Sequence, residues 1–395
     1  MLVNGVMEAA DSRGVAAQLS KLGYTPVTIT VTGSDDILAQ LGNIFSSLQG
    51  VKVDELSVFS RQLASILEAG VPLLEGLDAV QEQVRNKKFR EVICAVRKDI
   101  EHGSSFSESL EKYPNIFSPL IINMVRAGEK AGILSEELER ISVLLERDMD
   151  TVDKIKTATR YPMVVVASLM VAFVILIIFV IPQFATFFGA FKAELPLPTR
   201  ILMGINTIFQ HYWYWLIAVV AFLVYGFNRI LATENGRYNW DRFILLTPVF
   251  GPLFLKIFLS RFARMLSAML GSGIPILEAL SITAATVSNK QISKVILEMR
   301  DQVSQGKSLT EPMKASNTFP PIAIAMVSIG EKAGSLEGML NKVADYFDRE
   351  SDYTIKNLTP LLEPILIFGL GMVVLLFALG IFLPMWDLIN VYKNY

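Results

Sequence analysis

The sequence reads FSRQLASILEAGVPLLEGL over residues 59–77 and FARMLSAMLGSGIPILEAL over residues 262–280, and the letters GEKAG stand at residues 128–132 and again at residues 330–334. Self-similarity of this kind indicates a duplicated folding unit. Each copy leads into an apolar segment long enough to cross a bilayer. We therefore predict an all-α integral membrane protein that contains two homologous helical bundles.

The pattern inside each copy predicts helices joined by tight corners. Apolar residues recur at positions i, i+4, i+7 and i+8, the spacing of the buried stripe of an amphipathic helix; they are Phe59, Leu63, Ile66 and Leu67 in the first copy and Phe262, Leu266, Met269 and Leu270 in the second. Gly70 and Gly273 then suit left-handed C-caps, and Pro72 and Pro275 suit the start of a second helix.

Further along each copy, a serine precedes a glutamate by three residues, which is the spacing of a capping box. The two pairs are Ser105 with Glu108 and Ser308 with Glu311. The last helix of each copy is expected to start near residue 134 or 336 and to continue almost directly into the membrane, so that it could pass a push from the bundle to the bilayer.

Three apolar runs are candidate transmembrane helices: residues 163–181, 212–231 and 364–386. Their lengths approach or exceed the roughly 20 residues that cross about 30 Å of hydrocarbon. Basic residues gather before the first run and after the second, so the positive-inside rule places the N-terminus and both bundles in the cytoplasm and the C-terminus in the periplasm. The first residues lack a basic stretch followed by an apolar core, and we expect no cleavable signal peptide.

The predicted organisation follows from these boundaries. It comprises a small N-terminal region (1–50, with a helix at 9–22 and a strand at 26–32), a cytoplasmic bundle (51–160), a first transmembrane helix (161–183), a periplasmic loop (184–211), a second transmembrane helix (212–232), a cytoplasmic connector (233–258), a second bundle (259–362), a third transmembrane helix (363–386) and a periplasmic tail (387–395).

Composition argues against several classes of function. The net charge is -2 and no basic stripe is interleaved with aromatic residues, so we expect no nucleic-acid partner. The two histidines, His102 and His211, are far apart, and Gly306-Lys307-Ser308 lacks the glycine and the strand of a phosphate-binding loop. We therefore predict no catalytic residues, cofactor or metal. A cation held by the acidic runs near residues 136–139 and 148–153 stays an alternative to a solvated helix face.

The paired GEKAG motifs are the candidate functional site. One interpretation is structural: the glycines give a helix-to-helix corner its backbone freedom and close approach. The other adds that the charged side chains face a partner protein, and a corner can do both. The predicted partner-binding residues are Gly128, Glu129, Lys130 and Gly132 in the first copy and Gly330, Glu331, Lys332 and Gly334 in the second.

Nearly the whole chain resembles the polytopic inner-membrane platform proteins of bacterial type II secretion and type IV pilus assembly, the GspF and PilC family. The resemblance rests on the paired segments at 59–77 and 262–280, the paired GEKAG corners, and the stretch from Lys154 through Tyr161-Pro162 to Ile181-Pro182, with Thr159 in place of the family's usual aliphatic residue. The outer loop AELPLPTRIL is somewhat similar to the mannose-sensitive haemagglutinin pilus branch.

The resemblance implies a scaffold in the bacterial inner membrane that is not an enzyme. Such a protein contacts a cytoplasmic assembly ATPase, pilin or pseudopilin subunits and other inner-membrane assembly proteins, and it acts as a homo-oligomer. A small-solute transporter built from a tandem repeat is the alternative, but transporters usually carry polar groups and broken helices at the midplane. The spans also lack the residues of a membrane-bound enzyme.

The two copies differ at positions where their roles could differ. The differing pairs are Glu68 and Gly271, Arg126 and Ser328, and Tyr161 and Glu363.

Overall fold

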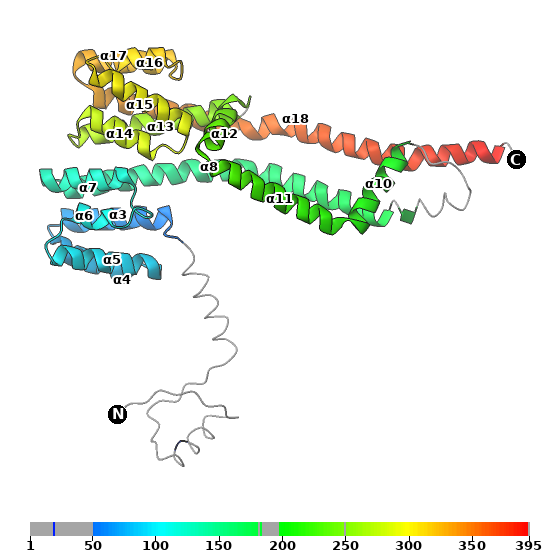
Figure 1. Cartoon of the computed structure of the whole chain (residues 1–395), viewed down its shortest axis with the longest axis horizontal. Coiled ribbons are helices and arrows are strands. Elements are labelled where there is room, and N and C mark those ends of the chain that lie inside the picture. Colours follow the sequence, from blue (N-terminus) through cyan, green and yellow to red (C-terminus); the bar gives the residue numbers. More distant parts are fainter. Residues whose placement is uncertain (1–18, 20–49, 181, 184–196, 249, 394–395) are drawn as a thin grey trace.

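A computed structural model describes residues 19, 50–180, 182–183, 197–248 and 250–393. Every regular element of these residues is helical, and the two bundles lie together at one end of a set of long helices (Figure 1). This confirms the all-α fold with two bundles. Apart from Leu19, the helix predicted at 9–22 lies outside the described residues, as do the strand predicted at 26–32 and most of the outer loop.

Repeat 1 consists of six helices around one apolar core. Phe59, Phe89 and Phe117 are each at most 3% exposed and come from three parts of the repeat, with ring centroids 5.4 and 6.5 Å apart. The helices are α3 (Val53–Glu68), α4 (Leu73–Gln83), α5 (Lys87–Glu101), α6 (Phe106–Glu111), α7 (Pro119–Ala131) and α8 (Leu134–Ile175).

Repeat 2 has the same order of helices. The first corner of each repeat is as predicted. Gly70 and Gly273 have φ values of 82° and 77°, and Pro72 and Pro275 stand immediately before the next helices. The helices are α13 (Phe250–Gly271), α14 (Ile276–Thr286), α15 (Lys290–Ser304), α16 (Thr310–Ala315), α17 (Pro321–Ala333) and α18 (Leu336–Lys393).

The capping-box prediction is correct in one copy only. In repeat 1 the Ser105 hydroxyl accepts from the backbone N–H of Glu108 at 3.2 Å, and the Glu108 carboxylate accepts from the Ser105 N–H at 3.1 Å. In repeat 2 the box with Ser308 and Glu311 is wrong. Leu309 already has helical dihedral angles there, so the Glu311 N–H bonds the backbone oxygen of Ser308 and not its hydroxyl.

The last helix of each repeat continues into an apolar segment, as predicted. α8 runs from its bundle into a π-helical turn, Leu176–Val180, and α18 runs without a break to Lys393. Both are long and apolar enough to span a membrane, and only 6% of the apolar window of each is buried. Bare apolar surface of this extent is what a lipid environment covers.

Among the described residues between the two repeats lie three shorter helices. They are α10 (Leu197–His211), α11 (Trp213–Leu231) and α12 (Glu234–Leu246). α10 falls where the sequence predicted only a loop. It packs Met203 and Ile205 against a small cluster around Ile177 and Phe377, which joins the far ends of α8 and α18.

Candidate functional site

The GEKAG segments form the corners between α7 and α8 and between α17 and α18. Gly132 and Gly334 are the C-caps, with φ values of 72° and 65°, a left-handed conformation that costs other residues about 1–2 kcal/mol. A Cβ atom on Gly128 would lie 3.1 Å from the Leu134 Cα, and one on Gly330 would lie 2.9 Å from the Met339 Cβ. The structure thus confirms both structural roles predicted for the glycines.

The glutamates of the motif point into their own repeats. The Glu129 carboxylate accepts from the backbone N–H groups of Phe106 and Ser107, at 2.6 and 3.0 Å, at the start of α6. Glu331 accepts from Leu309 and Thr310 at the start of α16, at 2.5 and 3.1 Å, and also from the Thr310 hydroxyl. A carboxylate favours the N-terminus of a helix, where N–H groups lack partners.

The lysines of the motif are the part of the site that remains free to meet a partner. Lys130 and Lys332 are exposed, and neither forms an ion pair with the residues that the structure describes. Partner binding through the two corners therefore stays a prediction, and it rests on the lysines more than on the glutamates.

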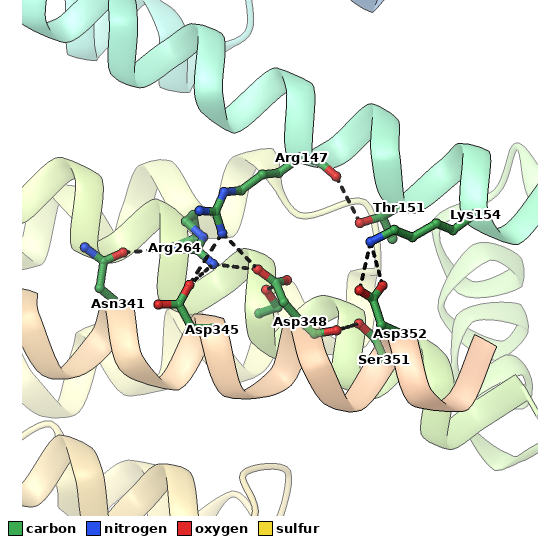
Figure 2. A network of polar contacts seen from close by, with 10 residues as sticks. Arg147, Thr151, Lys154, Arg264, Asn341, Asp345, Asp348, Ser351 and Asp352 are labelled. Atoms are coloured by element: carbon green, nitrogen blue, oxygen red, sulfur yellow. Dashed lines mark hydrogen bonds and ion pairs between the residues drawn. The ribbon is translucent and has the colours of Figure 1, made fainter. Parts of the chain in front are cut away.

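A second candidate site, which the sequence reading missed, is the joint where α8, α13 and α18 meet (Figure 2). The Arg264 guanidinium lies 2.8 Å from Asp345 and 2.5 Å from Asp348, and its side chain is 12% exposed. Arg147 of α8 approaches the same two carboxylates at 3.4 and 3.3 Å, and Lys154 pairs with Asp352 at 2.8 Å. The joint therefore ties repeat 1 to repeat 2 through charge.

The joint shifts the pKa values of its acids in opposite directions. Burial alone would raise the pKa of Asp345, but hydrogen bonds and charge from Arg264 and Arg147 outweigh it and lower that pKa. Burial raises the pKa of Asp148 even though Arg261 lies 2.9 Å away. Asp148 belongs to the acidic run at residues 148–153, for which a solvated helix face is one interpretation; Asp150 and Asp153 are exposed, whereas Asp148 is partly buried and pairs with Arg261.

One buried carboxylate links the first corner to repeat 2. Glu137 is fully buried and bonds the Ser272 hydroxyl at 2.5 Å and Arg140 at 2.8 Å. Burial raises its pKa above the ordinary value, although both partners oppose the shift. Since Glu137 also packs beside Gly128, the corner and the contact between repeats share one residue.

Beside the joint lies a cleft of about 760 Å³ between the repeats. Its walls combine apolar side chains such as Leu144 and Met265 with charged ones such as Lys156 and Asp153. The described residues form no group of three or more metal-ligating side chains there or elsewhere. The corners, joint and cleft are suited to holding elements in place and to docking.

Comparison with known proteins places this geometry in a family. The family profile for type II secretion system protein F matches the chain twice, at residues 59–182 and at residues 262–384, so it covers both repeats with the apolar segment that follows each. The two matches coincide with the duplication read from the sequence.

Curated relatives match over almost the full length. The type IV pilus assembly proteins PilC of Thermus thermophilus and of Myxococcus xanthus are 36% and 34% identical, over 98% and 97% of this chain and 95% and 91% of the relatives. The type II secretion system protein F of Aeromonas hydrophila is 30% identical over 97% of this chain and 98% of the relative.

Proposed function

The chain belongs to the type II secretion system protein F family, and on that premise we propose that it is a polytopic inner-membrane platform that couples a cytoplasmic assembly ATPase to the assembly of pilin or pseudopilin subunits. Its relatives carry the names of type IV pilus assembly and type II secretion proteins, which supports this role. Other inner-membrane assembly proteins and further copies of the chain are the remaining partners. The chain acts as a scaffold and not as an enzyme.

One observation carries the proposal: the helix that leaves each GEKAG corner is the helix that enters the apolar segment. At 1.5 Å per residue, α8 is about 63 Å long and α18 about 87 Å long. The charged joint locks these two helices together where they leave the bundles. A force applied at a corner is therefore transmitted to the membrane segments along a continuous helix.

The topology that we propose has three crossings. Both bundles lie at the same end of the long helices (Figure 1), so the chain has to return between them, and α11 supplies the return. Its 19 residues extend about 28 Å, close to the thickness of the hydrocarbon layer. The basic residues that follow it support a topology with the N-terminus in the cytoplasm and the C-terminus in the periplasm.

Photo-crosslinking in cells tests the partners. A photoreactive amino acid replaces Lys130 or Lys332, with exposed Lys98 on α5 as the matched control. The proposal expects capture of the assembly ATPase or of a pilin from at least one corner and of neither from the control. If identified products include no assembly ATPase and no pilin, the assigned role fails.

A glycine insertion tests the coupling. Two glycines inserted after Lys156 interrupt α8 between the joint and the apolar segment, whereas the control insertion after Gly50 lies before α3. We expect the first insertion to abolish pilus assembly or secretion, with normal protein levels, and the control to preserve both. Full activity of the Lys156 insertion would refute transmission along α8.

A further inference from the structure

Helix α12 stands at the junction between the long helices and repeat 2 (Figure 1). Its axis is bent by 101° from that of α11. The Thr233 hydroxyl accepts from the Gly236 N–H at 3.2 Å and holds this corner closed. The backbone segments approach so closely that a Cβ on Gly236 would lie 2.1 Å from the Ile230 oxygen. A helix at about a right angle to a membrane-spanning neighbour lies along the membrane surface.

The inner face of α12 is fixed to repeat 2. Asp241 is 9% exposed, and its carboxylate accepts from the backbone N–H of Lys290 at 2.7 Å, at the start of α15. In repeat 1 the helix equivalent to α15 is α5, and the amide of its N-cap residue, Asn86, donates at 2.8 Å to Glu55 of the repeat's own first helix. Repeat 2 has Phe258 in place of Glu55. The amide of the cap residue Asn289 donates instead to the backbone oxygen of Asp241 at 3.4 Å, so α12, from outside the repeat, supplies acceptors at the start of α15.

The outer face of α12 is apolar and uncovered. Trp240, Phe243 and Leu246 are 37%, 58% and 72% exposed. Trp240 also packs edge-on against Phe227 of α11, with ring centroids 4.9 Å apart, and lies 5.8 Å from the Phe243 ring. The aromatic surface is therefore continuous from the end of the candidate span onto α12.

Two arginines flank this apolar face. At 100° per residue, Arg237 and Arg242 lie on opposite edges of the face that Phe243 centres. Both are exposed, and neither forms an ion pair with any residue that the structure describes. An apolar face with aromatic residues and cationic edges is the pattern of a helix that lies in the membrane interface.

We propose that α12 is an interfacial helix that binds the anionic headgroups of the cytoplasmic leaflet and thereby fixes repeat 2 to the membrane surface. The inference rests on the proposed function through the crossing of α11. Phe243 and Leu246 enter the boundary between headgroups and acyl chains, and Arg237 and Arg242 meet lipid phosphates. Because Asp241 holds α12 to α15, the bilayer sets the height of repeat 2.

Fluorescence quenching measures the depth of α12. The full chain, with Trp213, Trp215 and Trp386 replaced by phenylalanine, retains Trp240 as its one tryptophan and is reconstituted into vesicles of phosphatidylcholine and phosphatidylglycerol. We expect lipid spin-labelled near the headgroup to quench Trp240 at least twofold more than lipid labelled near the chain end, and aqueous iodide to quench it weakly. Strong iodide quenching without lipid quenching would overturn the inference and would fit a surface that docks a protein partner. Maximal quenching by lipid labelled at the bilayer centre would also overturn it.

The lipid charge provides a second measurement. A basic residue near an anionic membrane contributes roughly fivefold to surface binding. The double variant Arg237→Gln with Arg242→Gln should abolish the excess of headgroup quenching in anionic over neutral vesicles. The matched control, Lys87→Gln with Lys88→Gln on α5, removes the same charge at exposed positions of repeat 1. This control should preserve the excess of headgroup quenching in anionic vesicles. If the arginine variant shows the same excess of headgroup quenching in anionic vesicles as the parent chain, the proposed binding of anionic headgroups is wrong.

A labelling experiment separates failure of this inference from failure of the proposed topology. In a Cys94→Ser background, Gln210→Cys and Asn235→Cys place single thiols at exposed positions on either side of α11. If an impermeant maleimide labels both from the same side, α11 does not cross and the topology fails. If it labels them from opposite sides while Trp240 lies in water, only the interfacial role of α12 fails.

Discussion

Replacing Glu129 with alanine should loosen α6 and leave α16 intact. The Glu129 carboxylate accepts two backbone N–H groups at the start of α6, at 2.6 and 3.0 Å. Glu331 makes the same contacts with α16 in repeat 2. Each variant can therefore be compared with an equivalent helix in the same molecule.

The size of the effect follows from the two lost bonds. A hydrogen bond to a charged group contributes about 1.5–3 kcal/mol, and loss of a helix cap costs about 0.5–2 kcal/mol. Because Glu129 is half-buried and water can replace part of its role, we expect a loss of about 2–3 kcal/mol in the local stability of α6. With a factor of ten for each 1.4 kcal/mol, local opening becomes about 30- to 150-fold more frequent.

Amide hydrogen exchange of the full chain in detergent measures this opening peptide by peptide. Exchange in residues 104–112 should accelerate in Glu129→Ala, and exchange in residues 307–316 should accelerate in Glu331→Ala, each without change in the other repeat. Equal changes in both helices, or none, would refute the capping role. Loss of function in Glu129→Gln with unchanged exchange would show instead that the carboxylate meets a partner.

Three further predictions concern the joint, the α12 corner and pH, each measured by the thermal midpoint of the full chain. Arg264→Met should cost about 2–3 kcal/mol because it removes the nearer and more buried partner of two carboxylates and leaves them only the longer contacts with Arg147. Arg61→Met is the equivalent change at a pair that is 45% exposed on each side, and it should cost about 0–1 kcal/mol; equal losses would contradict this prediction. Gly236→Ala should destabilise the chain through its clash with backbone, and Gly226→Ala, which has open space, should not. The raised pKa of Glu137 means that the folded chain holds this proton more tightly than the unfolded chain, so its contribution to stability rises as pH falls from neutral toward about 4.3. Glu137→Gln should remove that part of the rise, and an unchanged pH dependence would contradict the assignment.

Contacts within a repeat could be predicted from the sequence because they occur twice. The stripe from Phe59 to Leu67, the corner glycines and the run of the last helix into the membrane all follow from local patterns of period 3.6 or from glycine at a left-handed position. α10 could not be predicted in this way. Its position depends on packing against Ile177 and Phe377, which are distant in sequence.

The failed capping box has a similar cause. Ser308 and Glu311 have the correct spacing, but the N–H groups at the start of α16 are satisfied by Glu331, more than twenty residues later. The same carboxylate contact exists in repeat 1 beside a true capping box. Spacing alone therefore cannot decide which acceptor a helix start uses.

Several contacts between the repeats fall where the two copies differ. One ion pair within each repeat occurs at equivalent positions: Arg61 with Glu146 in repeat 1 and Arg264 with Asp348 in repeat 2. Several contacts that join the repeats use a residue without a like counterpart: Asp345 corresponds to Val143, Arg261 to Val58, Glu137 to Met339 and Ser272 to Ala69. The pair of Lys154 and Asp352 is an exception, because its counterparts are Lys356 and Asp150.

This asymmetry follows from how the repeats are joined. Two copies that meet through different faces need not keep the same residues there, because a face buried in one copy is exposed in the other. Gly271 shows the effect: a Cβ there would lie 2.7 Å from Glu337 and 3.4 Å from Arg140 of the other repeat, whereas its counterpart Glu68 is exposed. Self-similarity thus identifies the fold of each bundle, and several departures from it lie on the surfaces through which the bundles meet.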